Sequence, residues 1–133
     1  MRVLIVEDDF ASRRILQTFL ESYGECHIAV NGIEAVDAFQ KAWQESQPYD
    51  LICMDIMMPE MNGQDALRQI REIEKQMDIG NEDAVKVIMT TAIDKSRDVV
   101  TAFYEGGVSA YFVKPFNIED LEKELKVLRL IES

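Results

Sequence analysis

Short apolar runs alternate with longer amphipathic segments along this chain, and the alternation repeats five times. The short runs are rich in β-branched residues and have the length of strands, whereas the longer segments repeat their apolar residues at helical spacing. Strands that alternate with helices form a parallel sheet with helices on both faces. The predicted strands run from Arg2 to Val6, Cys26 to Val30, Tyr49 to Met54, Val85 to Thr90 and Ala110 to Val113.

The apolar run from Leu51 to Met54 predicts a strand buried on both sides, because a half-exposed strand would alternate apolar and polar residues. We expect the first, third and fourth strands to be central. Three amphipathic stripes predict helices packed on the sheet: Ile15, Leu16, Phe19 and Leu20; Ala66, Leu67, Ile70, Ile73 and Met77; and Ile118, Leu121, Leu125 and Leu128. The last helix adds Val127, Leu130 and Ile131, which leaves a partner or dimer surface and ordinary packing as alternatives.

Length and charge narrow the functions open to this chain. Its 133 residues fit one domain, residues 1–133, without an output domain. The net charge of −11 would repel nucleic-acid phosphates, so direct binding of DNA or RNA is not expected. No run approaches the ~20 apolar residues of a membrane span, and we expect a cytoplasmic protein. Cys26 and Cys53 are expected to be reduced core thiols, and the one histidine, His27, to be structural.

The residues that follow the apolar runs are the candidates for a site, because ligands of open α/β sheets bind outside the carboxyl ends of the strands. Those ends share one edge of a parallel sheet, so carboxylate, hydroxyl and ammonium groups are expected to meet there. The residues are Glu7, Asp8 and Asp9 after the first run, Asp55 after the third, Thr91 and Ala92 after the fourth, and Lys114 and Pro115 after the fifth.

The carboxylates of Glu7, Asp8 and Asp55 are expected to converge at this edge. Each like-charge pair would cost about 4 kcal/mol at an effective dielectric near 20, so the cluster requires a cation. Oxygen ligands with room for water suit Mg²⁺, with Mn²⁺ as a substitute. Together with Lys114, such an ion brings the formal charge to zero, and a phosphoryl anion can then approach Asp55.

Asp55 is therefore a candidate nucleophile for phosphoryl transfer. Lys114 would stabilise the transferring oxygens electrostatically. The Thr91 hydroxyl and the Ala92 backbone N–H would donate hydrogen bonds to the same oxygens.

Four blocks of this sequence together resemble the CheY-like receiver domains of bacterial response regulators. They are Leu4 to Asp9, Met54 to Gly63, Thr90 to Ala92 and Tyr111 to Phe116, and they stand in the family's order. The resemblance covers nearly the whole chain and implies an α/β, flavodoxin-like, doubly wound sheet of five parallel strands in the order 2-1-3-4-5 with five helices. It implies a two-component switch that takes a phosphoryl group from a sensor histidine kinase or histidine phosphotransfer protein and acts on a downstream protein target.

The family's metal site carries over residue by residue. Asp55 would be the phospho-acceptor, Asp8 a direct Mg²⁺ ligand and Glu7 a mainly water-mediated one, with the backbone carbonyl of Met57 as the third protein ligand. Asp9 lies one place past this acidic pair in the family's register and is left out of the site.

The resemblance also implies a switch. Lys114 would pair with Asp55 at rest, and the bond from Lys114 to Pro115 is expected to be cis. Thr91 and Tyr111 would form the switch pair that changes the surface of the fourth helix, fifth strand and fifth helix. Through that surface the expected monomer would be able to dimerise.

Competing functions make different demands on the same positions. An aspartyl-phosphate phosphatase would carry Asp-x-Asp, but the second place here is Met57, so slow turnover is expected. A flavodoxin-like electron carrier would need a Ser/Thr/Gly-rich loop where Glu7, Asp8 and Asp9 stand. A scaffold that is never phosphorylated would lack a pocket residue, and none is missing. In the family that this chain resembles, the positions two places past Asp55 and Thr91 control how fast the phosphoryl group is lost. They are Met57 and Ile93 here, both bulky and apolar, so the resemblance implies a persistent acyl phosphate.

Overall fold

The computed structural model describes residues 1–56, 58, 60–91 and 107–132. Five parallel strands form one sheet in the order β2-β1-β3-β4-β5, as expected from the sequence. The strands are β1 (Arg2–Val6), β2 (Glu25–Ala29), β3 (Leu51–Asp55), β4 (Lys86–Thr91) and β5 (Ala110–Val113). The predicted order is confirmed, and β1, β3 and β4 are the central strands.

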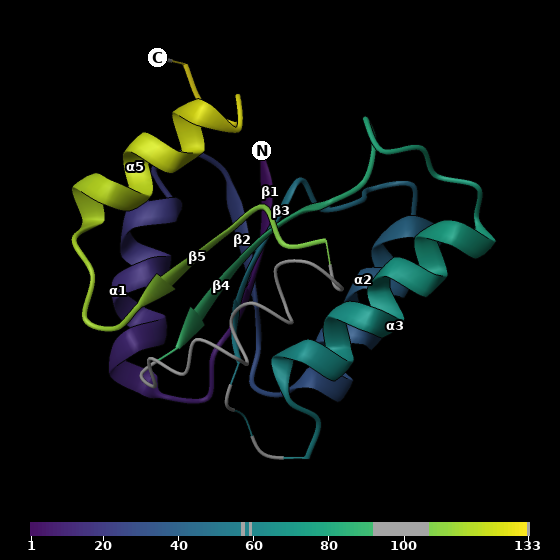
Figure 1. Cartoon of the computed structure of the whole chain (residues 1–133), viewed down its shortest axis with the longest axis horizontal. Helices are drawn as coiled ribbons and strands as arrows, with labels where there is room; N and C mark the ends of the chain where they lie inside the picture. The colour runs from purple at the N-terminus through teal and green to yellow at the C-terminus, as the bar shows by residue number, and fades with distance from the viewer. Residues whose placement is uncertain (57, 59, 92–106, 133) are drawn as a thin grey trace.

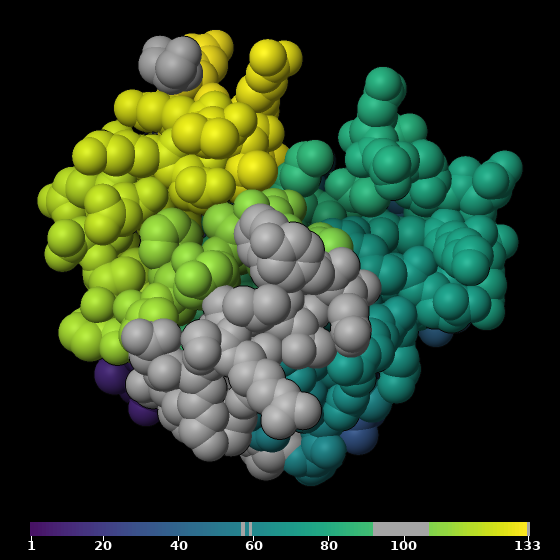
Figure 2. All heavy atoms as spheres, in the orientation of Figure 1, coloured from purple at the N-terminus to yellow at the C-terminus, as the bar shows by residue number. Residues whose placement is uncertain are grey.

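Four helices lie within the described residues, two on each face of the sheet (Figure 1). They are α1 (Phe10–Leu20), α2 (Gly32–Gln44), α3 (Gly63–Gln76) and α5 (Ile118–Val127). In Figure 1, α1 and α5 cover one face, and α2 and α3 cover the other. Figure 2 shows the segment from β5 through α5 on one side of the molecule and α3 on the other. The remaining expected helix would fall between β4 and β5, where residues 92–106 lie outside the described part of the chain.

Three helices begin at a polar residue whose side chain caps the first turn. Asp9 accepts from the backbone N–H of Ser12 at 2.9 Å, at the start of α1. Asn31 and Asn62 do the same for α2 and α3, accepting from the N–H of residues 34 and 65. Such caps satisfy backbone donors that the helix itself cannot. Asp9 therefore serves α1, in keeping with its omission from the predicted site.

Each face of the sheet carries its own apolar core. The core under α2 and α3 includes Leu4, Phe39 and Leu67, and the core under α1 and α5 includes Ile5 and Leu121, all with no more than 1% of their surface exposed. Burial of each large aliphatic side chain contributes roughly 1.5–3 kcal/mol to stability. Residues of β3 are buried along its whole length, as the apolar run Leu51 to Met54 predicted.

Two residues of the predicted stripes are not core residues. Ile15 is 58% exposed and Met77 is 45% exposed. In α1 the buried positions are Leu16 and Leu20, four residues apart on one helix face, which turns Ile15 away from the sheet. Met77 caps the end of α3 and lies beyond its last turn. Among the described residues, no helix has the length and apolarity needed to cross a membrane.

Candidate functional site

The acidic side chains meet at the carboxyl edge of the sheet because β1 and β3 are neighbours. Val6 lies opposite Met54 in the parallel ladder, which places Glu7 and Asp55 side by side. Ligand oxygens of Glu7, Asp8 and Asp55 all lie within 4.8 Å of one another. The structure thus brings together three of the carboxylates that the sequence placed in this site.

Two of these three carboxylates are withdrawn from water. Glu7 is 1% exposed and Asp55 is 6% exposed, whereas Asp8 is exposed. Burial raises the pKa of Glu7 above its ordinary value, and the neighbouring Asp55 raises it further, although Lys114 opposes both effects. The cluster therefore holds negative charge where charge is costly, which favours binding of a cation.

Lys114 reaches this cluster from the end of β5. Its ammonium contacts the carboxylate of Glu7 and lies 3.5 Å from Oδ2 of Asp55. The expected pairing with Asp55 is present, but the closer partner is Glu7, whose side chain is one methylene longer than an aspartate. Burial alone would lower the pKa of Lys114, but Glu7 and Asp55 outweigh it and the pKa is raised. The lysine therefore remains a cation at neutral pH.

The expected switch residues lie on the two strands beside Lys114. Thr91 ends β4 with only 2% of its surface exposed, and its carbonyl accepts from the backbone N–H of Lys114 at 2.7 Å. Tyr111 lies on β5 opposite Met89 and is 45% exposed. The bond from Lys114 to Pro115 is cis, as the resemblance implied.

Two expected site residues cannot be placed. Ala92, the predicted second donor, and Met57, the predicted carbonyl ligand, both lie outside the described residues. Ile93, the second apolar position beside the predicted acyl phosphate, lies outside them as well. Their roles stay predictions from the sequence.

The described donor set suits a divalent cation of the hard, oxygen-seeking kind. Glu7, Asp8 and Asp55 offer only carboxylate oxygens, and one of the three, Asp8, is exposed enough to leave room for water. The three carboxylates carry three negative charges and the ammonium of Lys114 carries one positive charge, so these four groups sum to two negative charges when all are ionised. That residual charge matches the charge of Mg²⁺ or Mn²⁺.

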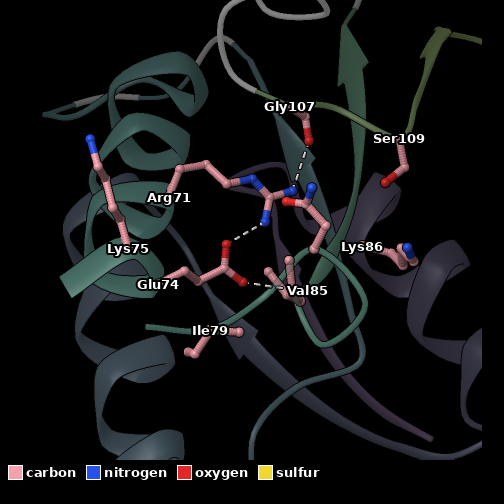
Figure 3. A pocket seen from close by; sticks show the side chains of 10 residues that line it. Arg71, Glu74, Lys75, Ile79, Val85, Lys86, Gly107 and Ser109 are labelled. Carbon is pink, nitrogen blue, oxygen red and sulfur yellow. Dashed lines mark hydrogen bonds and ion pairs between the residues drawn. The ribbon is translucent and has the colours of Figure 1, made fainter. Parts of the chain in front are cut away.

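A polar network around the buried carboxylate of Glu74, which sequence reasoning missed, lies at the amino end of β4. Oε1 of Glu74 accepts from Arg71 at 2.6 Å, and Oε2 accepts from the backbone N–H of Val85 at 2.7 Å (Figure 3). Arg71 also donates to the carbonyl of Gly107 at 2.7 Å. The network ties α3 to the starts of β4 and β5 beside a cavity of about 440 Å³. The sequence does not predict this contact, because a glutamate among the other polar residues of a helix has no pattern that distinguishes it as buried.

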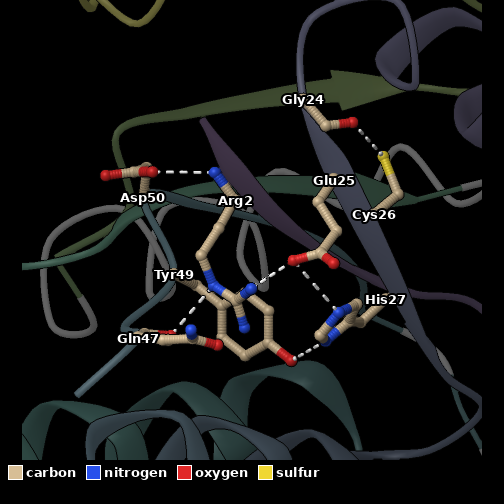
Figure 4. Close-up of polar contacts among 8 residues, drawn as sticks. All are labelled: Arg2, Gly24, Glu25, Cys26, His27, Gln47, Tyr49 and Asp50. Carbon is tan, nitrogen blue, oxygen red and sulfur yellow. Dashed lines mark hydrogen bonds and ion pairs between the residues drawn. The ribbon is translucent and has the colours of Figure 1, made fainter. Parts of the chain in front are cut away.

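His27 lies on the edge strand β2, opposite Leu4 of the neighbouring strand β1. Its Nδ1 lies 2.7 Å from the hydroxyl of Tyr49, and its Nε2 lies 3.6 Å from Glu25 (Figure 4). Arg2 contacts the same Glu25 and lies over the Tyr49 ring. These contacts connect β1, β2 and the start of β3, in keeping with the structural role expected of this histidine.

Comparisons with known proteins agree with this geometry. The family model of the response regulator receiver domain matches residues 3–126. A probable transcriptional regulator, ycf27, of Porphyra purpurea is 35% identical over 130 residues, covering 96% of this chain and 47% of that protein. The chain spans about half the length of the curated relatives of this kind that it matches.

Two of the solved structures that match this chain are similar to it in both fold and sequence. The first is the Saccharomyces cerevisiae complex of the histidine phosphotransfer protein Ypd1 with the receiver domain of its downstream response regulator Ssk1. The match has a TM-score of 0.82 and 32% identity, and covers 100% of this chain and 93% of the matched one.

The second is the receiver domain of the Pseudomonas aeruginosa sensor histidine kinase PA1611, solved with a magnesium ion in its active site cleft. It matches with a TM-score of 0.71 and 27% identity, covering 95% of this chain and 94% of that one. The sheet is parallel in the order 2-1-3-4-5, and its carboxyl edge carries an acidic cluster with a lysine beside it. The family model spans nearly all residues. This chain therefore belongs to the response regulator receiver domain family.

Proposed function

We propose that Asp55 is the phospho-acceptor of this receiver domain and that residues 1–133 act as one phosphorylation switch. The observation that carries the proposal is the position of Lys114, whose ammonium lies between the buried carboxylates of Glu7 and Asp55. A buried carboxylate beside a fixed cation at the carboxyl edge of an α/β sheet is suited to accept an anionic group.

The proposed reaction transfers a phosphoryl group from a phosphohistidine side chain. A carboxylate oxygen of Asp55 attacks phosphorus, the P–N bond to the imidazole breaks, and the leaving imidazole takes up a proton. Lys114 neutralises the phosphoryl oxygens as they approach, and the hydroxyl of Thr91 donates a hydrogen bond to one of them after a small movement. Asp55 carries the phosphoryl group as an acyl phosphate at the end of the step.

Glu7, Asp8 and Asp55 would hold Mg²⁺ or Mn²⁺, with the Met57 carbonyl as a further ligand. When bound, the ion supplies positive charge that offsets the three carboxylates and the phosphoryl oxygens. Glu7 has a second task in this proposal, because it keeps the ammonium of Lys114 at the rim of the site until the phosphoryl group arrives.

The proposed partners are a phosphohistidine protein, either a sensor histidine kinase or a phosphotransfer protein, and a downstream protein target in the cytoplasm. The matched structure that contains Ypd1 and Ssk1 supports the first of these, since it holds a phosphotransfer protein together with a receiver domain. The output is proposed to arise when Tyr111, 45% exposed here, changes position with Thr91 and alters the surface around β5 and α5. The proposed resting form is a monomer, and dimerisation would use that same surface.

A small phosphoryl donor tests this proposal directly. Incubation with acetyl phosphate and Mg²⁺ should add one phosphoryl group to the wild-type chain, measured by intact-mass spectrometry. Asp55→Asn should add none, because an amide is not a nucleophile for phosphorus. Asp78→Asn is the matched control: Asp78 is exposed and has a positive φ of 56°, a conformation that asparagine also adopts readily.

The outcomes separate the competing functions. A covalent adduct in wild type and Asp78→Asn that is missing from Asp55→Asn supports the switch. Rapid release of phosphate over many cycles would indicate a phosphatase instead. Absence of any adduct at saturating Mg²⁺ would favour a scaffold that is never phosphorylated.

A further inference from the structure

Gly32 approaches the loop after Asp55 more closely than any residue with a side chain could. A β-carbon added to Gly32 would lie 2.5 Å from the carbonyl oxygen of Met61 and 2.8 Å from its Cβ and Cγ. The backbone N–H of Gly32 donates to that same oxygen at 3.1 Å. Gly32 is buried, and its φ lies outside the left-handed region, so glycine is required here for space and not for conformation.

Gly63 makes a second close approach, this time to Asp55 itself. A β-carbon on Gly63 would lie 2.4 Å from the carbonyl oxygen of Asp55 and 3.0 Å from Cα of Ile56. The N–H of Gly63 donates to the carbonyl of Ile56 at 2.9 Å, and the N–H of Ile56 donates to Thr90 at 2.9 Å. The backbone at Asp55 is therefore held from α3 on one side and from β4 on the other.

Met61 and Gly63 are separated only by Asn62, which caps α3 with its side chain. Two peptide units at the start of α3 therefore join the Met61 carbonyl to Gly63. Since Gly63 packs against the Asp55 carbonyl, the start of α2 is mechanically linked to the proposed phospho-acceptor. The link runs through backbone atoms, which cannot rotate out of the way as a flexible side chain can.

We infer that Gly32 is a positioning residue: its contact with Met61 sets the position of the Asp55 carboxylate relative to Glu7 and Asp8. This inference rests on the proposed function of Asp55. A methyl group at residue 32 must push the Met61 oxygen away by about 1 Å to reach an ordinary contact distance. Displacements of about 1 Å in a reacting group can reduce a rate by up to a hundredfold.

The test compares two glycine-to-alanine variants. Gly32→Ala adds the crowded methyl group, whereas Gly80→Ala is the matched control because a β-carbon on Gly80 meets nothing within 4 Å. Two quantities are measured: the affinity for Mn²⁺ alone, by electron paramagnetic resonance of the free ion, and the rate of labelling by acetyl phosphate at low Mg²⁺. We expect Gly32→Ala to lose about tenfold or more in both, and Gly80→Ala to match wild type.

Thermal unfolding followed by circular dichroism shows whether a change is confined to the site. The positioning role predicts that Gly32→Ala keeps a cooperative unfolding transition while its Mn²⁺ affinity falls. A folded Gly32→Ala protein whose Mn²⁺ affinity and labelling rate stay within about twofold of Gly80→Ala would overturn the inference. Labelling that fails in wild type while Mn²⁺ still binds would contradict the proposed function of Asp55, and the Mn²⁺ comparison would still decide the role of Gly32.

A second pair of variants carries the test if Gly32→Ala does not fold. Met61→Gly removes two of the three crowded atoms, Cβ and Cγ, and leaves the carbonyl oxygen. The double variant of Gly32→Ala with Met61→Gly is expected to fold and to bind Mn²⁺ more weakly than Met61→Gly alone, because the contact with the oxygen remains. Equal Mn²⁺ affinity in these two proteins would reject the positioning role.

Discussion

The ammonium of Lys114 contacts the carboxylate of Glu7, although the two residues are 107 positions apart in the chain. The same ammonium lies 3.5 Å from Asp55, so one cation serves two buried acids from two different strands. The parallel order of β1, β3, β4 and β5 makes this contact, because it stacks all four carboxyl ends along one edge.

Glu7→Gln is expected to stabilise the metal-free protein at neutral pH. Burial and Asp55 raise the pKa of Glu7 in the folded state. Glu7 therefore contributes to folding stability below about pH 4.5, and this contribution to stability is lost as the pH rises through the raised pKa. Removing the charge should therefore raise the unfolding free energy near pH 8. Urea unfolding in the presence of a chelator measures the unfolding free energy of both proteins from about pH 5 to pH 8. The difference between Glu7→Gln and wild type should become smaller as the pH falls. A less stable Glu7→Gln protein at pH 8 would contradict the idea.

Mg²⁺ is expected to raise the melting temperature of the wild-type chain but not that of Asp8→Asn. A ligand that binds only the folded state stabilises it by about 2.7 kcal/mol at a hundred times its dissociation constant. Asp8 is exposed, so its replacement should disturb the fold little while removing one of the proposed metal ligands. Asp78→Asn should keep the full response to Mg²⁺. Equal shifts in all three proteins would show that the ion acts elsewhere.

Glu74→Ala is expected to lower the unfolding free energy by about 2–3 kcal/mol, because it leaves the buried N–H of Val85 without its acceptor and removes one of the partners of Arg71. Glu72→Ala, an exposed change on the same helix, should stay within about 0.5 kcal/mol of wild type. Urea unfolding measures both. Since the network lies at the amino ends of the strands, labelling by acetyl phosphate should be preserved in folded Glu74→Ala.

Cys53 is expected to resist alkylation in the native state. Complete burial raises the pKa of its thiol to about 12, so little reactive thiolate forms near pH 8. Cys26 is only partly buried and should react faster. Peptide mapping after treatment with iodoacetamide, with and without urea, compares the two sites. Native labelling of Cys53 at the rate found in urea would mean that β3 opens readily.

Met57→Asn is expected to shorten the lifetime of phospho-Asp55, and Ile93→Glu should act in the same direction. The receiver family uses these positions to control loss of the phosphoryl group, and both are apolar here. Decay of the adduct can be followed by intact mass after the small donor is removed. Loss of the wild-type adduct within seconds in Mg²⁺ buffer would show that the apolar residues do not shield it.

The pattern of apolar and polar residues predicted most of the fold. Parallel central strands are buried on both faces, so continuous apolar runs such as Leu51 to Met54 identify them in the sequence. The edge strands could be distinguished from the central strands on this basis. Strand ends were less certain by one or two residues, and Asp55 and Thr91 proved to be the last residues of β3 and β4. Ile15 was wrongly placed in the core because spacing alone does not decide which of two adjacent apolar residues faces the sheet.

By itself the sequence determined the order of the strands and of the described helices, the polar residues close to each strand end, and the family, because these depend on local periodicity and on short blocks of residues. Only the tertiary structure decided that Lys114 lies nearer to Glu7 than to Asp55, that Glu74 joins α3 to β4, and that Gly32 lies in close contact with Met61. These are contacts between distant segments, where side-chain length and differences of an ångström in backbone position determine the partner. No periodicity along the chain encodes distances of that kind.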